Sequence, residues 1–115
     1  MNEVFLEGTV VSITMVEHAA SDKPHCVCQL RVAHRNQKQQ TVSELYTINA
    51  WNRLAAWAAQ ALKSGMRVCV KGYLTQRTQQ NVVVTEVTAN RFVIQQATPP
   101  LPNAVPAQAS IPEIA

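Results

Sequence analysis

Only one stretch of this sequence repeats its apolar residues at helical spacing. In residues 53–63 (RLAAWAAQALK) apolar side chains recur at intervals of three and four, at Leu54, Trp57, Ala58, Ala61 and Leu62. Asn52 stands where a side chain caps a helix start, and Gly65 stands where a chain leaves a helix. We therefore predict one helix over 53–63, with its apolar stripe, Trp57 included, in the core.

The rest of the first 96 residues has the composition and alternation of strands. β-Branched and alternating segments predict five strands, at 2–13, 25–35, 43–51, 66–77 and 82–94. Non-periodic polar segments predict loops at 16–24 and 36–42 and a turn at 78–81. Gly8 and Gly72 inside strands predict bends, and the last strand is expected to kink near Ala89–Asn90.

Five strands with one helix between the third and fourth are the element order of an OB-fold. This predicts an all-β fold, a five-stranded Greek-key barrel, over residues 1–96. Residues 97–115 hold five of the six prolines and no basic residue, which predicts a flexible Pro-rich C-terminal tail. A chain of 115 residues has room for one such domain and its tail, and excludes a large multidomain enzyme.

Charge and cysteine content narrow the classes of function. Residues 1–96 carry all ten basic side chains and six acidic ones, a net of +4 that suits an anionic partner. Glu3 and Glu7 lie where a secretory signal has basic residues, and no apolar run is long enough to span a membrane, so we expect a cytoplasmic protein. Three irregularly spaced cysteines, Cys26, Cys28 and Cys69, predict buried thiols rather than disulfides or a metal site.

No pattern in the sequence indicates catalysis or a cofactor. No carboxylate pair has useful spacing, no glycine-rich phosphate loop is present, and no serine has a histidine at a motif spacing. We expect a protein that is not an enzyme and that needs neither metal nor cofactor.

Cations and one tryptophan are the candidates for a nucleic-acid site. Arg31 and Arg35 lie on the polar face of their predicted strand, and with Lys38 in the next loop they form a basic stripe or merely solvated charge. Trp51 alternates away from the core-side Tyr46, so it is either an exposed ring that stacks a base or a strand end twisted into the core.

Further candidates lie on the helix and the fourth strand. Tyr73 is predicted to stack a base beside Lys71 or to pack at a subunit interface. Arg77 precedes the turn between the last two strands, a usual ligand contact of OB-folds, and predicts a phosphate contact. Arg53 is a phosphate contact or an ordinary helix residue. The three histidines, His18, His25 and His34, are interpreted as loop or strand-end residues.

Three segments resemble one known family. NEVFLEGTV, INAWNRLAAWAAQALKSGMRVCVKGYLTQR and TEVTANRF are similar, in this order, to segments of bacterial single-stranded DNA-binding proteins. PHCVCQLRVAHR also resembles primosomal replication protein N, a relative that acts in replication restart. The resemblance implies a barrel that binds single-stranded DNA with little sequence preference. It also implies a homo-oligomer, either a tetramer or a dimer.

Departures from the family pattern leave two functions open. Trp51 falls on a stacking position of the family, but Leu45 stands where the family commonly has a tryptophan, and the ending IPEIA lacks an acidic, aromatic tip. The first function is the coating of exposed strands in replication, recombination or repair, close to the nucleoid, with contacts to other replication or repair proteins. The alternative is a protein-interaction module of a primosome or replication-restart complex that binds nucleic acid weakly. An oligosaccharide-binding OB-fold has little support.

Overall fold

The computed structural model describes residues 1–18 and 21–96. The elements in chain order are β1 (Val4–His18), β2 (Ser21–Arg35), β3 (Thr41–Trp51), α1 (Asn52–Ala61), β4 (Arg67–Gln79) and β5 (Val82–Gln96). The predicted tail, 97–115, lies outside the described residues, so its character stays a prediction. In the described part, no helix has both the length and the apolar character needed to cross a membrane.

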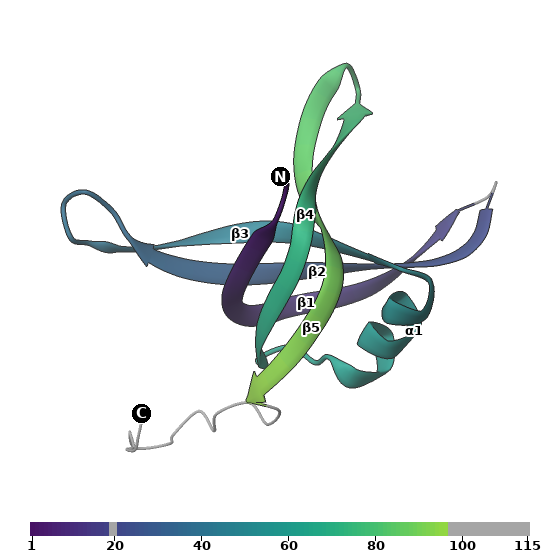
Figure 1. Cartoon of the computed structure of the whole chain (residues 1–115), viewed down its shortest axis with the longest axis horizontal. Helices are drawn as coiled ribbons and strands as arrows, with labels where there is room; N and C mark the ends of the chain where they lie inside the picture. The colour runs from purple at the N-terminus through teal and green to yellow at the C-terminus, as the bar shows by residue number, and fades with distance from the viewer. Residues whose placement is uncertain (19–20, 97–115) are drawn as a thin grey trace.

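The strands close into a barrel in the order β1-β2-β3-β5-β4 (Figure 1). Neighbouring strands pair antiparallel, except that β3 and β5 run parallel. α1 connects β3 to β4 and packs against β1, β2 and β3. The predicted fold class is thereby confirmed: this is an OB-fold barrel with one helix between its third and fourth strands.

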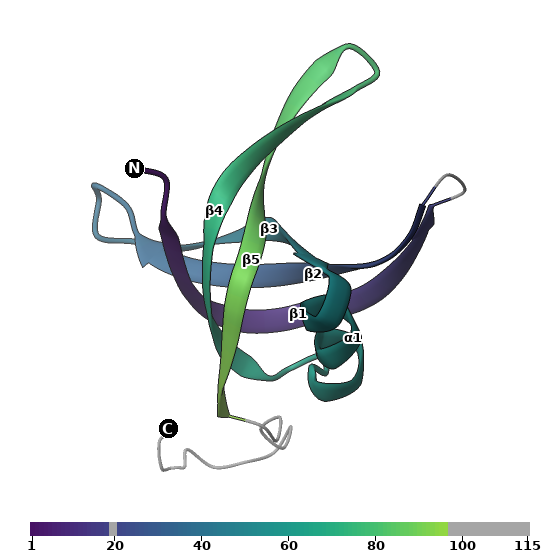
Figure 2. The same ribbon diagram turned by 45° about the vertical axis from the view of Figure 1, so that its right-hand side comes forward.

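Two hairpins extend well beyond the barrel (Figure 2). We call residues 31–45 the β2–β3 arm and residues 73–88 the β4–β5 arm. A third hairpin, β1–β2, corrects the sequence prediction, because the segment 16–24 was expected to be a loop. Instead Val16 pairs with His25, and His18 pairs with Ser21. Backbone pairing in a projecting hairpin requires no alternation of apolar and polar side chains, which is why the pattern gave no sign of it.

Two glycines allow strands to cross at close range. At Gly8, β1 leaves β4 and turns to pair with β2, and an added Cβ would collide with the carbonyl oxygen of Arg31. At Gly72 an added Cβ would collide with the carbonyl oxygen of Thr88. There the β4–β5 register shifts, and Asn90 is the extra residue of the resulting bulge. The predicted bends and the predicted kink are confirmed.

The core lies inside the barrel and under α1. Its fully buried side chains include Leu30, Ile48 and Val68. Cys26 and Cys28 are buried with them, as predicted, whereas Cys69, on β4, is only half-buried and departs from the prediction. Burial raises the pKa of the Cys28 thiol to about 12. A thiol in this environment stays protonated and behaves as a small apolar side chain. Among the described residues, no three histidine, cysteine or acidic side chains gather into a metal-binding group.

The helix differs from its prediction in three ways. Trp57 is 40% exposed rather than buried, and its ring stacks loosely on Phe92, with centroids 6.1 Å apart. Asn52 is not the cap: it is the first helical residue, with a positive φ of 58° that asparagine tolerates, and this turns the chain sharply out of β3. The helix ends at Ala61, before Lys63. Gly65 does follow the helix in a left-handed conformation, with φ 94°, as expected.

Candidate nucleic-acid interface

The pairing of β2 with β3 gathers the predicted ligand-binding residues on one face. Arg35 pairs with Thr41, Arg31 with Leu45, and His25 with Trp51. Side chains alternate along a strand, so all the odd-numbered residues of this β2–β3 pairing share the outer face. The even-numbered residues, such as Leu30 and Ile48, fill the core. Trp51, Arg31 and Arg35 therefore belong to one continuous surface.

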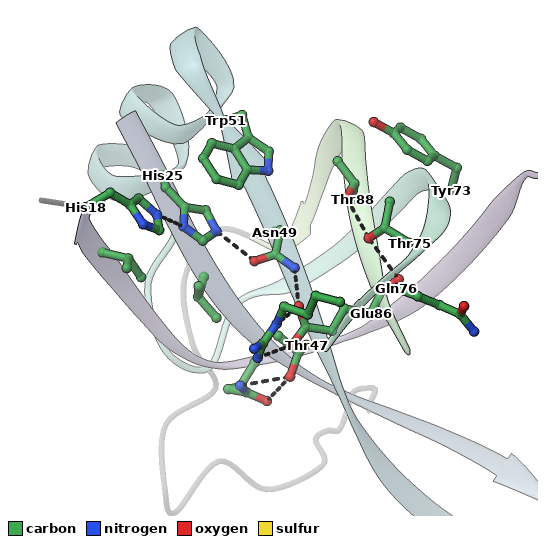
Figure 3. A pocket seen from close by; sticks show the side chains of 14 residues that line it. His18, His25, Thr47, Asn49, Trp51, Tyr73, Thr75, Gln76, Glu86 and Thr88 are labelled. Carbon is green, nitrogen blue, oxygen red and sulfur yellow. Dashed lines mark hydrogen bonds and ion pairs between the residues drawn. The ribbon is translucent and has the colours of Figure 1, made fainter. Parts of the chain in front are cut away.

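A hollow of about 730 Å³ opens at the Trp51 end of this surface (Figure 3). All five strands contribute to its lining, and three of the predicted site residues are among them: Trp51, Tyr73 and Arg77. The indole is 37% exposed. An aromatic ring held partly open at a pocket wall is what base stacking requires.

Two imidazoles stack side by side on one face of Trp51. The imidazole of His25 lies flat against the indole, with centroids 3.9 Å apart and planes 2° from parallel. His18 lies beside His25, with its centroid 4.9 Å from that of His25 and 5.7 Å from that of the indole. The sequence prediction treats the histidines as loop or strand-end residues and does not foresee this stack. Counting outward from the tip of the β2–β3 arm would have paired His25 with Trp51, but the predicted loop, 36–42, was two residues too long.

A chain of hydrogen bonds runs from the stack across the floor of the pocket (Figure 3). His18 Nε2 and His25 Nδ1 are 2.8 Å apart, and His25 Nε2 is 2.7 Å from Asn49 Oδ1. Asn49 Nδ2 donates to Glu86 Oε1 at 2.8 Å. The Asn49 amide is buried, with its oxygen on His25 and its nitrogen on Glu86, so the orientation of His25 is fixed from below.

This chain of hydrogen bonds ends at Glu86, whose ion pair with Arg77 changes the interpretation of Arg77. Its Nε and Nη2 donate to the two carboxylate oxygens of Glu86 at 3.1 and 3.0 Å, and its Nη1 donates to Gln79 at 3.1 Å. The hydrogen bond from Arg77 is the main cause that lowers the pKa of the Glu86 carboxyl, so this carboxyl is ionised at neutral pH. The positive charge of Arg77 is thus already balanced, and Glu86, which seemed isolated in the sequence, has a partner.

The other predicted residues lie outside the pocket. Lys38 is in the loop at the tip of the β2–β3 arm, and Arg53 is exposed in the first turn of α1. Lys71 faces a different hollow of about 300 Å³, where its Nζ is 5.8 Å from the centroid of Phe5. Lys71 and Tyr73 line different hollows rather than a common one, and between them lies Gly72, where β4 crosses β5 at close range.

Polar side chains that line the pocket are largely bonded to one another. Gln29 Nε2 donates to Thr47 Oγ1 at 3.2 Å, and the hydroxyls of Thr75 and Thr88 are 3.0 Å apart. Together with the His25–Asn49–Glu86 chain, these bonds occupy most of the groups that would otherwise read the edge of a base. The pocket therefore offers an aromatic surface and few unused hydrogen-bonding groups.

The fold resembles those of several solved structures. Wild-type single-stranded DNA-binding protein from Thermus aquaticus superposes with a TM-score of 0.72 at 18% identity, covering 84% of this chain and 50% of that chain. The SSB domain of a Synechococcus protein gives a TM-score of 0.63 at 17% identity, covering 80% of this chain and 93% of that one. The protein PriB from Ralstonia solanacearum gives 0.66 at 15% identity, covering 84% and 99%.

These identities are low, and the superpositions show the fold alone. The chain spans about half the length of the Thermus aquaticus protein that it matches. No curated protein sequence matches it significantly. A sequence profile of the single-strand binding protein family does match residues 1–98, which is most of the chain. The chain belongs to the single-strand binding protein family.

Proposed function

We propose that this protein binds single-stranded DNA, coats exposed strands with little sequence preference, and does so in replication, recombination or repair. The observation that carries this proposal is the shared outer face of β2 and β3, where the open indole of Trp51 and the cations Arg31 and Arg35 point the same way. Membership of the single-strand binding protein family supports it.

The two ends of this face suit the two chemical parts of a strand several nucleotides long, its bases and its phosphates. A base stacks on the open part of Trp51, with Tyr73 lining the same pocket, and such stacking contributes about 1–3 kcal/mol per base. The phosphates follow the β2–β3 arm past Arg31 and Arg35 toward Lys38. Among the described residues, the guanidinium of Arg31 and the ammonium of Lys38 have no hydrogen bond or ion pair to protein, so both charges are available.

Low sequence preference follows from the lining of the pocket. Its amide and hydroxyl groups are bonded to one another, so they gain little from one base over another. Every base has a flat aromatic face, and stacking on Trp51 is therefore open to all four. We infer from the same arrangement that the protein acts by binding and not by catalysis.

The proposal includes self-association in the cytoplasm as a dimer or tetramer. Phe5 is 69% exposed on β1, and the apolar Val93 is exposed nearby on the wall of the same hollow. Large apolar side chains gathered on a barrel wall are typical of a surface that is covered in the assembled protein. Other replication and repair proteins are expected partners of such an assembly.

One observation favours a second function, a protein-interaction module in a primosome or replication-restart complex. Leu45 lies 58% exposed on the binding face, where the family commonly has a tryptophan, so this face has fewer rings than a strong DNA binder uses. The β4–β5 arm also ends in the exposed Val82 and Val83. An apolar tip of this kind suits a protein contact better than a phosphate chain.

A titration with fluorescent oligo-dT at two salt concentrations tests the proposal. The variant Trp57→Phe is used, so that intrinsic emission reports Trp51 alone. Strand coating predicts tight, salt-sensitive binding with quenching of this emission, because a base that stacks on the indole quenches it. Absence of binding at low salt would reject the first function and leave the second.

A further inference from the structure

Two histidines lie against the ring that is proposed to stack a base. Histidine is the side chain whose charge ordinarily changes between about pH 5 and pH 8. His25 is buried flat against Trp51, and His18 lies beside His25 on the same face of the indole. A change of charge here acts on the ring that receives the base.

The hydrogen-bond chain fixes where the protons are. Asn49 Nδ2 donates to the Glu86 carboxylate, so Asn49 Oδ1 faces His25 and accepts from its Nε2–H. In the neutral pair, His25 Nδ1 therefore has no hydrogen and accepts from the Nε2–H of His18. One added proton is taken up at His18 Nδ1, and the Nε2–H of His18 still donates to His25 Nδ1. If that shared hydrogen crosses to His25 Nδ1, the bond reverses and the positive charge moves to His25.

The pair can hold one extra proton but not two. With one, every hydrogen bond of the chain is kept. With two, both nitrogens at the 2.8 Å contact would carry hydrogens that point at each other. The charged groups around the pair are Glu86 of β5, whose carboxylate attracts the positive charge through Asn49, and Arg77 of β4, which Glu86 neutralises. On β2 itself, Lys23 lies two residues from His25.

A bound strand adds negative charge and an aromatic ring to the same place. Phosphates near the pair favour its charged form, and an imidazolium flat against the indole is a favourable cation–π contact. We propose that the His18–His25 pair takes up one proton when a single strand binds, so that affinity for single-stranded DNA rises as the pH falls through the imidazole range. This inference rests on the proposed function.

The direction follows from linkage. A ligand that favours the protonated pair binds with proton uptake, and its affinity then increases as the proton concentration increases. Because one proton is involved, the gain is at most about tenfold per pH unit. If a phosphate pairs with the new charge, the slope of log K against log salt also steepens, by about 0.7 between pH 8 and pH 5.5.

The experiment is a set of oligo-dT titrations at about pH 5.5 and about pH 8, at several salt concentrations. Wild type is compared with His18→Phe, which keeps an aromatic ring beside the indole but cannot share a proton with His25, and with His25→Gln. The matched control is His34→Gln. His34 is an exposed histidine near Glu44 on the opposite face of β2, and its loss is expected to leave the pH effect in place. Far-UV circular dichroism verifies the fold of each variant, and His18→Phe alone suffices if His25→Gln does not fold.

The expected result is tighter binding at low pH in wild type and in His34→Gln, and a much smaller pH effect in His18→Phe. Equal affinity at the two pH values would overturn the inference while leaving single-strand binding intact. A pH effect that vanishes in His34→Gln but survives in His18→Phe would also overturn it. Absence of binding at both pH values would reject the proposed function itself, so the two failures are distinct.

Discussion

The two arms of the barrel carry similar cations in very different states. On the β2–β3 arm, Arg31 has no acidic partner among the described residues. On the β4–β5 arm, Arg77 is held by two hydrogen bonds to the buried carboxylate of Glu86. The difference shows that a basic residue in a sequence is not the same as a positive charge available to a ligand. Under the proposed function, the first arm follows the phosphates of the strand and the second shapes the pocket.

Gly72 at the base of the β4–β5 arm gives the largest expected effect. Gly72→Ala places a Cβ against the Thr88 carbonyl, which cannot move without breaking the bulge. We expect a loss of about 2–4 kcal/mol in the free energy of unfolding, measured by urea denaturation. Ala33→Ser in the β2–β3 arm is the control and should change stability by less than about 0.5 kcal/mol. A Gly72→Ala protein with the same free energy of unfolding as wild type would contradict the close approach of β4 to β5 at this residue.

Trp51→Ala tests the end of the face that both arms share. Loss of the ring should weaken oligo-dT binding by about 1–3 kcal/mol, because one stacked base is lost. Trp57→Ala is the matched control, since that ring lies on α1 and does not line the pocket. Fluorescence anisotropy measures both. Equal affinities for wild type and Trp51→Ala would remove this ring from the site.

Substituting Arg31 and Arg77 separately tests the difference between the two arms directly. Arg31→Ala should reduce the slope of log K against log salt by about 0.7, the value for one phosphate contact on a single strand. Arg77→Ala should leave that slope nearly unchanged, because its charge is already balanced by Glu86. The measurement is a salt titration of each variant against the same oligonucleotide. Equal slope changes in the two variants would erase the distinction between the arms.

Acid stability gives the smallest expected effect. The folded protein lowers the pKa of Glu86 below its ordinary value of 4.5, mainly through Arg77. A carboxyl with a lowered pKa stabilises the fold above its unfolded pKa, and this contribution is lost as the pH falls through the folded one. Between neutral pH and about pH 4.5 the contribution is constant, so the decline begins below that value. When the melting temperatures of wild type and Glu86→Gln are plotted against pH, the two plots should differ in slope only in this acid range. Parallel plots would contradict the ion pair.

Much of the fold was predictable because strands keep a period of two. That period puts Trp51 on the face of its strand opposite Ile48. In the structure Ile48 and, on the paired strand β2, Leu30 are buried while Trp51 is 37% exposed, which decides between the two alternatives for this ring. The prediction was wrong where two strands cross at close range. Lys71 and Tyr73 line different hollows, with the Gly72 crossing between them, although the two alternate correctly in sequence.

The candidate site was only partly predictable, because the chain of hydrogen bonds across the pocket floor depends on the register between strands that are distant in sequence. Nothing near Glu86 in sequence indicates that it meets Asn49, and the histidines acquire a role only once β1, β2 and β3 are aligned. The helix shows a different failure. Helical periodicity places Trp57 on the buried stripe and leaves Ala55 off it, whereas the structure buries Ala55 and Ala58 and leaves the indole 40% exposed. The space between α1 and the barrel takes these small side chains and not a whole indole.

The short parallel pairing of β3 with β5 has a consequence for the order of folding. It joins only Ile48 to Val87 and Asn49 to Thr88, and the adjoining Asn49–Glu86 hydrogen bond spans 37 residues of chain. Contacts between distant segments with little area of their own form after local hairpins have closed the intervening loop. The side-chain amide of Asn49, which fixes His25, is therefore positioned only in the last step of barrel closure. A folding intermediate that lacks the pairing of β3 with β5 is expected to lack an ordered pocket.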